Sequence, residues 1–130
     1  MQLVDTNVIS ELCRRSPNAG VLAWAHAQSA IALSVVTLEE IAFGLAWRPN
    51  AVLQAWFDRE LMQYEILPVT AGIARQAGAM RGAFAARGIR RSQADLLIAA
   101  TAQAHQLSLV TRNLRDFEGC GVPLLNPFSG

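Results

Sequence analysis

Short continuous apolar runs alternate along the chain with longer stretches in which apolar residues recur at helical spacing. The run at residues 2–4 predicts a buried strand, and Asp5-Thr6-Asn7 directly after it suits the start of a helix. Pro17-Asn18 predicts the start of a second helix, and the apolar run at residues 31–36 predicts a second buried strand. The first quarter of the chain therefore supplies two strands and two helices.

The middle of the chain predicts four further helices. Thr37 is expected to cap a helix that runs to about Trp47, where Arg48-Pro49-Asn50 interrupts the pattern. A helix ending near Gly88 and another spanning about residues 93–105 come later. A fourth helix is predicted directly after Arg48-Pro49-Asn50, before the two helices just named. Its apolar face consists of Leu53, Trp56, Phe57, Leu61 and Tyr64.

Three more apolar runs predict strands that alternate with these helices. They lie at residues 66–69, 107–111 and 122–125, and the last is expected to be a short edge strand. Alternating strands and helices favour an α/β sandwich with a mostly parallel sheet and helices on both faces. Because no repeat, linker or low-complexity segment interrupts the pattern, we expect residues 1–130 to form a single domain.

Composition adds an expected partner and an expected compartment. Hydrophobic residues make up 52% of the chain and charged residues 16%, which indicates an ordered protein with apolar surface for a partner to cover. No apolar run approaches the roughly 18 residues of a membrane span, and Asp5 lies where a signal peptide would be basic or apolar. We expect no membrane association and a cytoplasmic protein.

The basic residues are all arginine, and the formal net charge is only +1. Arginine suits phosphate and carboxylate recognition, although the absence of lysine could equally reflect a GC-rich genome. The cysteines Cys13 and Cys120 and the histidines His26 and His105 have no metal-ligand spacing, so a zinc site is disfavoured. Nucleic-acid binding therefore has to be argued from the positions of side chains.

Four of the ten acidic residues follow predicted strands or begin predicted helices: Asp5, Glu40, Asp95 and Asp116. In a parallel sheet such junctions share the edge at which ligands of open α/β folds bind. Carboxylates that converge there repel one another and raise one another's pKa unless protons, arginines or a cation compensate them. Magnesium or manganese suits such all-oxygen ligation.

Each of these acids also has a purely structural explanation. Glu40 and Asp95 both lie three residues after a threonine or serine, which is the capping-box spacing that stabilises a helix start. Asp5 could be an acid favoured by a helix dipole, and Asp116 a turn residue. Asp95, however, begins an almost wholly apolar helix that has to be buried.

A second chemistry would make Asp5 the nucleophile of a phosphatase. Such enzymes carry a second acid two residues after the nucleophile, and this chain has Asn7 there.

Four segments of the sequence, in order, resemble those of the PIN-domain family, and within it the VapC toxins and their FitB-like relatives. The segments are Leu3-Val4-Asp5-Thr6-Asn7-Val8-Ile9-Ser10-Glu11, Ser34-Val35-Val36-Thr37-Leu38-Glu39-Glu40-Ile41, Ala94-Asp95-Leu96-Leu97-Ile98-Ala99-Ala100-Thr101-Ala102 and Leu109-Val110-Thr111-Arg112-Asn113-Leu114-Arg115-Asp116-Phe117. The closing Asn126-Pro127-Phe128 is also similar to FitB-like members. The resemblance covers nearly the whole chain and implies the three-layer α/β/α sandwich of PIN domains.

The resemblance implies a catalytic set of four acids, which are Asp5, Glu40, Asp95 and Asp116. Asp5, Glu40 and Asp95 are the core metal-binding acids of this set, with Asp5 and Asp95 expected as the metal ligands, and the cofactor is Mg²⁺ or Mn²⁺. Some relatives carry an acid at the position of Asn113, so this chain departs from that pattern and Asp116 is preferred as the fourth acid. The resemblance further implies supporting roles for Asn7, Thr111 and Asn113 and a solvated Glu39. Hydrolysis of a phosphodiester would in addition give Arg112 or Arg115 a phosphate to contact.

The implied function is a metal-dependent endoribonuclease, the toxin of a VapBC-type toxin-antitoxin pair, which a cognate DNA-binding antitoxin neutralises. A homodimer is expected, with the segments around Trp47 and Trp56 as the apolar contact. A row of arginines leading toward Asp95 could guide RNA or simply be a solvated helix face: Arg75, Arg81, Arg87, Arg90 and Arg91. The alternative function is a non-catalytic PIN module that binds RNA or a DNA-binding antitoxin within a repressor complex.

Overall fold

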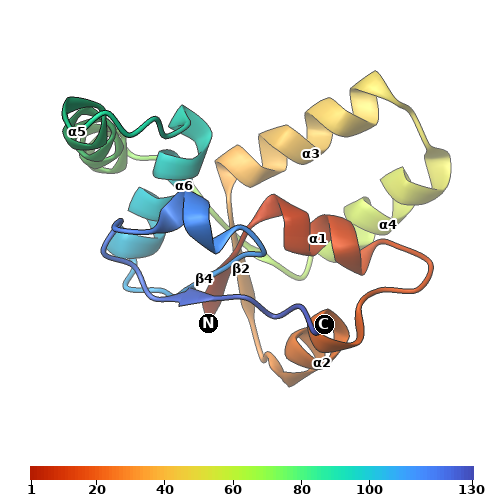
Figure 1. Ribbon diagram of the computed structural model, residues 1–130. Helices are drawn as coiled ribbons and strands as arrows, with labels where there is room; N and C mark the ends of the chain where they lie inside the picture. Colours follow the sequence, from red (N-terminus) through yellow and green to blue (C-terminus); the bar gives the residue numbers. More distant parts are fainter.

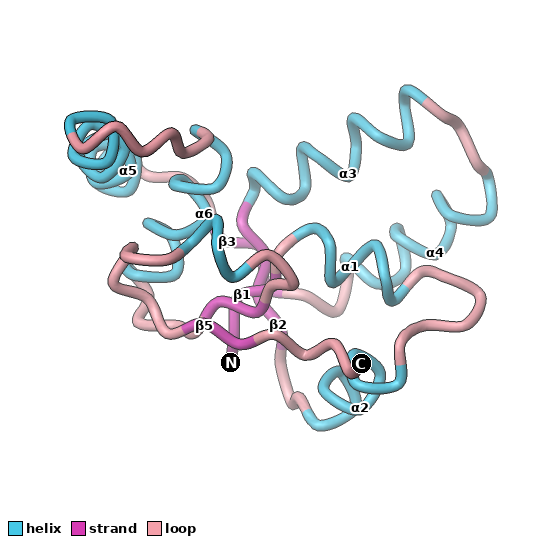
Figure 2. Tube along the Cα trace, in the orientation of Figure 1, coloured by secondary structure: helices cyan, strands magenta, loops and turns pink.

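One sheet of five parallel strands, in the order β3-β2-β1-β4-β5, runs through the computed structural model, which describes residues 1–130 (Figures 1 and 2). The first strand is central and pairs with β2 on one side and β4 on the other. The strands are β1 Gln2–Val4, β2 Ile31–Ser34, β3 Glu65–Leu67, β4 Leu109–Val110 and β5 Leu124–Leu125. The predicted α/β fold with a mostly parallel sheet is confirmed, and the sheet is parallel throughout.

Helices cover both faces of this sheet because the three central strands carry buried apolar side chains on both sides. Leu3 of β1 packs with α5 and α6, whereas its neighbour Val4 packs with α1, α2 and α4 in a second core. Figure 1 shows these two groups of helices on opposite sides of the strands. The helices are α1 Thr6–Leu12, α2 Ala19–Ala27, α3 Val35–Trp47, α4 Ala51–Leu61, α5 Ala71–Ala86 and α6 Gln93–Ala104, followed by a short 3-10 helix, η1 Leu114–Phe117.

The boundary between β2 and α3 lies three residues earlier than the sequence predicts. The hydroxyl of Ser34 accepts a hydrogen bond from the N–H of Val36 over 3.1 Å and caps the helix, which begins at Val35. Thr37, the predicted cap, lies inside the first turn, fully buried and without a hydrogen-bond partner for its hydroxyl. The prediction failed because Val35 and Val36 are β-branched and extend the apolar run of the strand past the cap.

The remaining elements agree with the sequence to within a few residues, except that η1 was not predicted. Its four residues follow β4, and the backbone N–H of Asp116 donates to the carbonyl of Asn113 over 3.1 Å. No helix of the structure combines the length and apolar character needed to cross a membrane.

The C-terminal segment after β5 crosses the molecule and ends beside α2, as Figure 2 shows. Asn18, the cap of α2, donates through its side-chain amide to the carbonyl of Ser129 over 2.9 Å and accepts from the Ser129 N–H over 3.0 Å. A Cβ atom at Gly20 would approach the Pro127 carbonyl oxygen too closely and lie 2.8 Å from the Ser129 nitrogen. The segment therefore lies directly against the first turn of α2.

We predict that Gly20→Ala destabilises the protein by about 1–3 kcal/mol, because the methyl group displaces backbone that cannot move without losing the Asn18 contacts. Gly78→Ala is the matched control, since a Cβ at this helical position in α5 meets nothing within 4 Å. That substitution should stabilise by about 0.5–1 kcal/mol through helix propensity. Urea unfolding of both variants measures the difference, and a Gly20→Ala protein as stable as wild type contradicts the packing.

Candidate active site

Asp5 lies at the carboxyl end of the central strand and caps α1. Its N–H continues the sheet by donating to the Val110 carbonyl, and its Oδ1 accepts from the Thr6 N–H over 2.8 Å. Its Oδ2 accepts from the Thr111 hydroxyl over 2.9 Å and from the Asn7 amide over 3.1 Å. Burial raises the pKa of Asp5, these three hydrogen bonds oppose that rise, and the nearby Asp116 charge adds to it. The carboxylate is thus held in place by groups from α1 and by Thr111, directly after β4.

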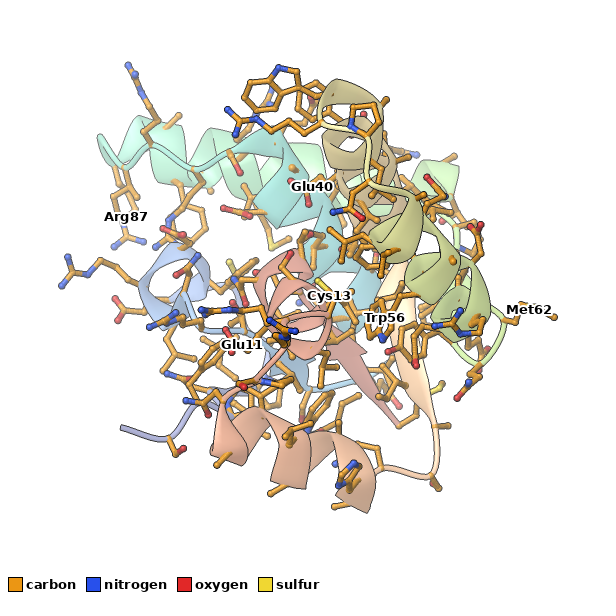
Figure 3. The ribbon with its side chains drawn as sticks, turned by 90° about the vertical axis from the view of Figure 1, so that its right-hand side faces the viewer. Glu11, Cys13, Glu40, Trp56, Met62 and Arg87 are labelled. Carbon is orange, nitrogen blue, oxygen red and sulfur yellow. The ribbon has the colours of Figure 1, made fainter.

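Glu40 is linked to Asp5 by a hydrogen bond from the side-chain hydroxyl of Thr6. Thr6, whose N–H binds Asp5, donates its side-chain hydroxyl to Oε1 of Glu40 over 2.7 Å. Because α3 begins at Val35, Glu40 lies in its second turn and no longer has the position of a capping-box acid. The capping explanation for Glu40 is therefore wrong, and its side chain turns toward α1, beside which Figure 3 shows it.

Asp95 lies in the first turn of α6, as the sequence predicts. Its backbone N–H donates to the Ser92 hydroxyl over 3.0 Å, so Ser92 is the cap, but no hydrogen bond returns from the Ser92 N–H to the carboxylate. Partial burial raises the pKa of Asp95, and the charges of Asp5, Asp116 and Glu40 raise it further against the opposing effect of Ser92. The four predicted acids therefore share one electrostatic environment.

Asp116 is the most exposed of the four acids, on η1 beyond β4. The loop before it is fixed by Thr111, which is fully buried and whose hydroxyl accepts from the Asn113 N–H over 3.0 Å while donating to Asp5. The Asn113 side chain makes no hydrogen bond within the protein. Thr111 thus ties the loop that carries Asp116 to the buried carboxylate of Asp5.

No basic side chain compensates this charge. The one ion pair of the structure joins Arg14 to Glu11 over 3.2 Å, and none involves the four acids. No three acidic, histidine or cysteine side chains of the structure lie in an arrangement that would by itself hold a metal ion. Magnesium characteristically keeps several waters and takes only one or two carboxylates from the protein, so an open, all-oxygen and uncompensated set fits that ion.

The arginines near this centre differ in what they contact. Arg112 follows Thr111, donates its backbone N–H to the Asn7 amide oxygen over 3.1 Å, and places its guanidinium over the ring of Phe128. Arg115 lies exposed on η1 and makes no ion pair. Arg91, predicted as part of a basic margin, instead stacks on Phe84 and donates to a backbone carbonyl over 2.8 Å. At Arg91 the structure therefore shows a packing role.

Two residues of the site had no role in the sequence-based reasoning. Thr6 joins Asp5 to Glu40. The only feature of the sequence that pointed to Thr6 was its position between Asp5 and Asn7, both of which were predicted site residues. Glu11 is 7% exposed and accepts from the backbone N–H of Asn18 over 2.8 Å, the first cause of its lowered pKa, which Arg14 lowers further. Figure 3 shows Glu11 between α1 and α2, where it supports the loop that joins them.

Comparison with known proteins places this fold and site in a family. The model of the PIN domain matches residues 3–119. The chain belongs to the PIN-domain family. A VapC ribonuclease, Y4jK, from Sinorhizobium fredii is 36% identical, with 98% of each chain covered. The toxin FitB from Neisseria gonorrhoeae is 34% identical, and the alignment covers 98% of this chain and 99% of that protein.

Solved structures agree with this assignment. The FitAcB structure from Neisseria gonorrhoeae superposes with a TM-score of 0.88 at 34% identity and covers 98% of both chains. VapBC2 from Rickettsia felis, bound to a DNA fragment from its promoter, superposes with a TM-score of 0.82 at 26% identity, covering 96% of this chain and 97% of that one. The predicted three-layer α/β/α architecture of the family is confirmed.

The raised pKa of Asp95 predicts that the acidic centre lowers stability at neutral pH. Well below pH 3.8, the ordinary pKa of aspartate, Asp95 is protonated in both the folded and the unfolded chain and costs nothing. As the pH rises, the unfolded chain ionises first, and the penalty grows until the folded group has ionised. Asp95→Asn should therefore raise the thermal midpoint at pH 7 in chelator, and the gain should vanish near pH 3.5. Asp58→Asn, at an exposed position of α4, should show no such pH-dependent gain. Destabilisation by Asp95→Asn at pH 7 contradicts the assignment.

Proposed function

We propose that this protein is a divalent-metal-dependent endoribonuclease that acts as the toxin of a VapBC-type toxin-antitoxin pair. The observation that carries the proposal is that Asp5, at the carboxyl end of the central strand, is linked through Thr6 to Glu40 and through Thr111 to the loop before Asp116, with no ion pair to any of these acids. Its relatives at 34–36% identity include a VapC ribonuclease and the toxin FitB, aligned over nearly their whole length. The structure of the site and the comparisons therefore support the same function.

In this proposal Asp5 and Asp95 hold Mg²⁺ or Mn²⁺, and Glu40 and Asp116 complete the acidic centre. When bound, such an ion lowers the pKa of water and polarises the phosphorus-oxygen bonds of a phosphodiester. The chain itself supplies position: Thr111 and Asn7 fix one oxygen of Asp5, while Thr6 fixes its other oxygen and orients Glu40. Preset carboxylates lose little conformational freedom when the ion and RNA arrive.

We further propose a DNA-binding antitoxin as the partner of this chain. The structurally similar FitAB and VapBC2 assemblies are described as bound to DNA fragments. An uncompensated acidic centre is a favourable place for a basic side chain of such a partner, which would replace the charge of the metal. The rival function is a PIN module that binds RNA or the antitoxin without cleaving; it predicts binding that survives loss of any one acid.

The catalytic proposal predicts that Asp95→Asn folds but loses at least about a hundredfold in RNA cleavage, since even partners outside the first ligand shell of a metal can cost that much. Asparagine keeps the size and helix-start compatibility of aspartate and removes the charge that a divalent ion requires. Cleavage of an RNA substrate in magnesium or manganese, with thermal unfolding measured in parallel, tests this.

Glu39→Gln is the matched control for that experiment. Glu39 is exposed and precedes Glu40 on the same helix, so its neutralisation should leave cleavage near the wild-type rate. Chelator should abolish wild-type cleavage and added metal should restore it. Chelator-resistant cleavage would remove the metal from the mechanism, whereas RNA binding without any cleavage by wild type would favour the non-catalytic module.

We also propose a homodimer, in which exposed apolar side chains of the α3 and α4 segments are covered. Phe43 is 60% exposed, Trp47 67% and Val52 79%, and the rings of Phe43 and Trp47 pack with centroids 5.9 Å apart. Trp56, the other tryptophan suggested by the sequence, packs instead against Phe57. Light scattering at micromolar concentration, without antitoxin, should give twice the mass of the chain; a single-chain mass would be incompatible with the dimer.

A further inference from the structure

Arg112 is held by an aromatic ring from the far end of the chain. Its guanidinium carbon lies 4.6 Å from the centroid of the Phe128 ring, and its backbone N–H is bound to Asn7, the residue whose amide donates to Asp5. Two hydrogen bonds therefore separate the backbone of Arg112 from the buried carboxylate. Its side chain leads from the acidic centre to the C-terminal segment.

The ring that supports Arg112 is itself fixed in position. The N–H of Phe128 donates to the Asn126 side chain over 3.0 Å, and the next residue, Ser129, is bound on both its N–H and its carbonyl by Asn18. Asn18 donates its own N–H to the buried carboxylate of Glu11 over 2.8 Å. The segment that carries Phe128 is thus fastened to the end of α1 and the start of α2.

The guanidinium of Arg112 lies over the Phe128 ring and has no other partner within the protein. It forms no ion pair and donates no side-chain hydrogen bond within the protein, although Glu11 is near enough to respond to its charge. Arg91 stacks on an aromatic ring in the same way but spends a donor on the Glu118 carbonyl. An arginine whose guanidinium is held over an aromatic ring and whose N–H groups are free is preset for bidentate contact with a phosphate.

We propose that Arg112 and Phe128 form a phosphate-binding subsite beside the acidic centre, with Arg112 contacting an RNA backbone phosphate and Phe128 acting as its positioning residue. The proposal rests on the ribonuclease function proposed above and assigns to the C-terminal segment a part in substrate binding. The backbone of Arg112 is linked to Asp5 through Asn7, so an RNA bound at the acidic centre would have this exposed side chain nearby. The attraction is independent of base sequence because it is directed at phosphate.

The test measures binding of a fluorescein-labelled single-stranded RNA of about 20 mixed-sequence nucleotides to Asp95→Asn protein in chelator, at several salt concentrations. In this background Arg112→Ala should weaken binding about tenfold at low salt, as expected for loss of a charged hydrogen-bond donor. The slope of log Kd against log salt should fall by about 0.7, the contribution of one phosphate contact in single strands. Arg59→Ala, which removes an exposed arginine from α4, should change neither quantity.

Phe128 is tested by the same measurement. Phe128→Ala should weaken binding about threefold, as expected for loss of a cation-π contact, and Phe128→Tyr, which keeps the ring, should restore the affinity. Since Phe128 acts through Arg112, Phe128→Ala should have no further effect in the Arg112→Ala background. A merely structural role of the C-terminal segment would instead weaken binding equally in both backgrounds.

Each outcome decides the proposal. The expected losses, the reduced salt slope and the coupling between the two positions would support the subsite. Unchanged binding by Arg112→Ala, an unchanged salt slope, independent effects of the two substitutions, or no RNA binding at all would overturn it. Metal-dependent cleavage by the wild type is measured separately, so the ribonuclease function can stand while the subsite falls.

Discussion

A carboxylate buried at the end of the central strand is the constraint on which the rest of the site depends. Asp5 is 6% exposed, and a buried charge is tolerated only where hydrogen bonds replace its water. Three donors do so, and they come from α1 and from Thr111 after β4. Each donor has a second contact: Thr6 binds Glu40, Asn7 binds the backbone of Arg112, and Thr111 binds the loop before Asp116. The hydrogen bonds to Asp5 therefore also position the rest of the site.

The buried carboxylates that the proposed function needs also lower the stability of the fold. A cluster of carboxylates could be stabilised by arginines, of which the chain has eleven, yet none forms an ion pair with the four acids. Burial and mutual repulsion therefore raise the pKa of Asp5 and Asp95 and leave the centre in deficit of positive charge. The proposed divalent cation, or a basic side chain of the proposed partner, would relieve that deficit, and its binding would then stabilise the fold.

Local patterns predicted most of the fold, and the failures occurred where a distant contact or a competing propensity decided the outcome. The parallel sheet followed from the alternation of apolar runs and helical stretches, whose order permits few other arrangements. The start of α3 was predicted wrongly, because the β-branched residues Val35 and Val36 continue the apolar pattern of the strand past Ser34, the residue that caps the helix. The convergence of the acids could be expected from the junctions, whereas the link from Thr6 to Glu40 spans 34 positions of sequence and had no local signal.

The sequence also could not predict which arginines pack within the fold and which are free to bind a ligand. Arg91 lies between a ring and a backbone carbonyl, with one guanidinium nitrogen buried and unpaired, so its charge is committed to holding η1 near α5. Arg112 has a comparable ring beneath it, but that ring arrives from sixteen residues further along the chain and leaves the edge of the guanidinium free. Burial and unused donors, which only the folded chain defines, therefore distinguish an arginine that stabilises from one available to a ligand.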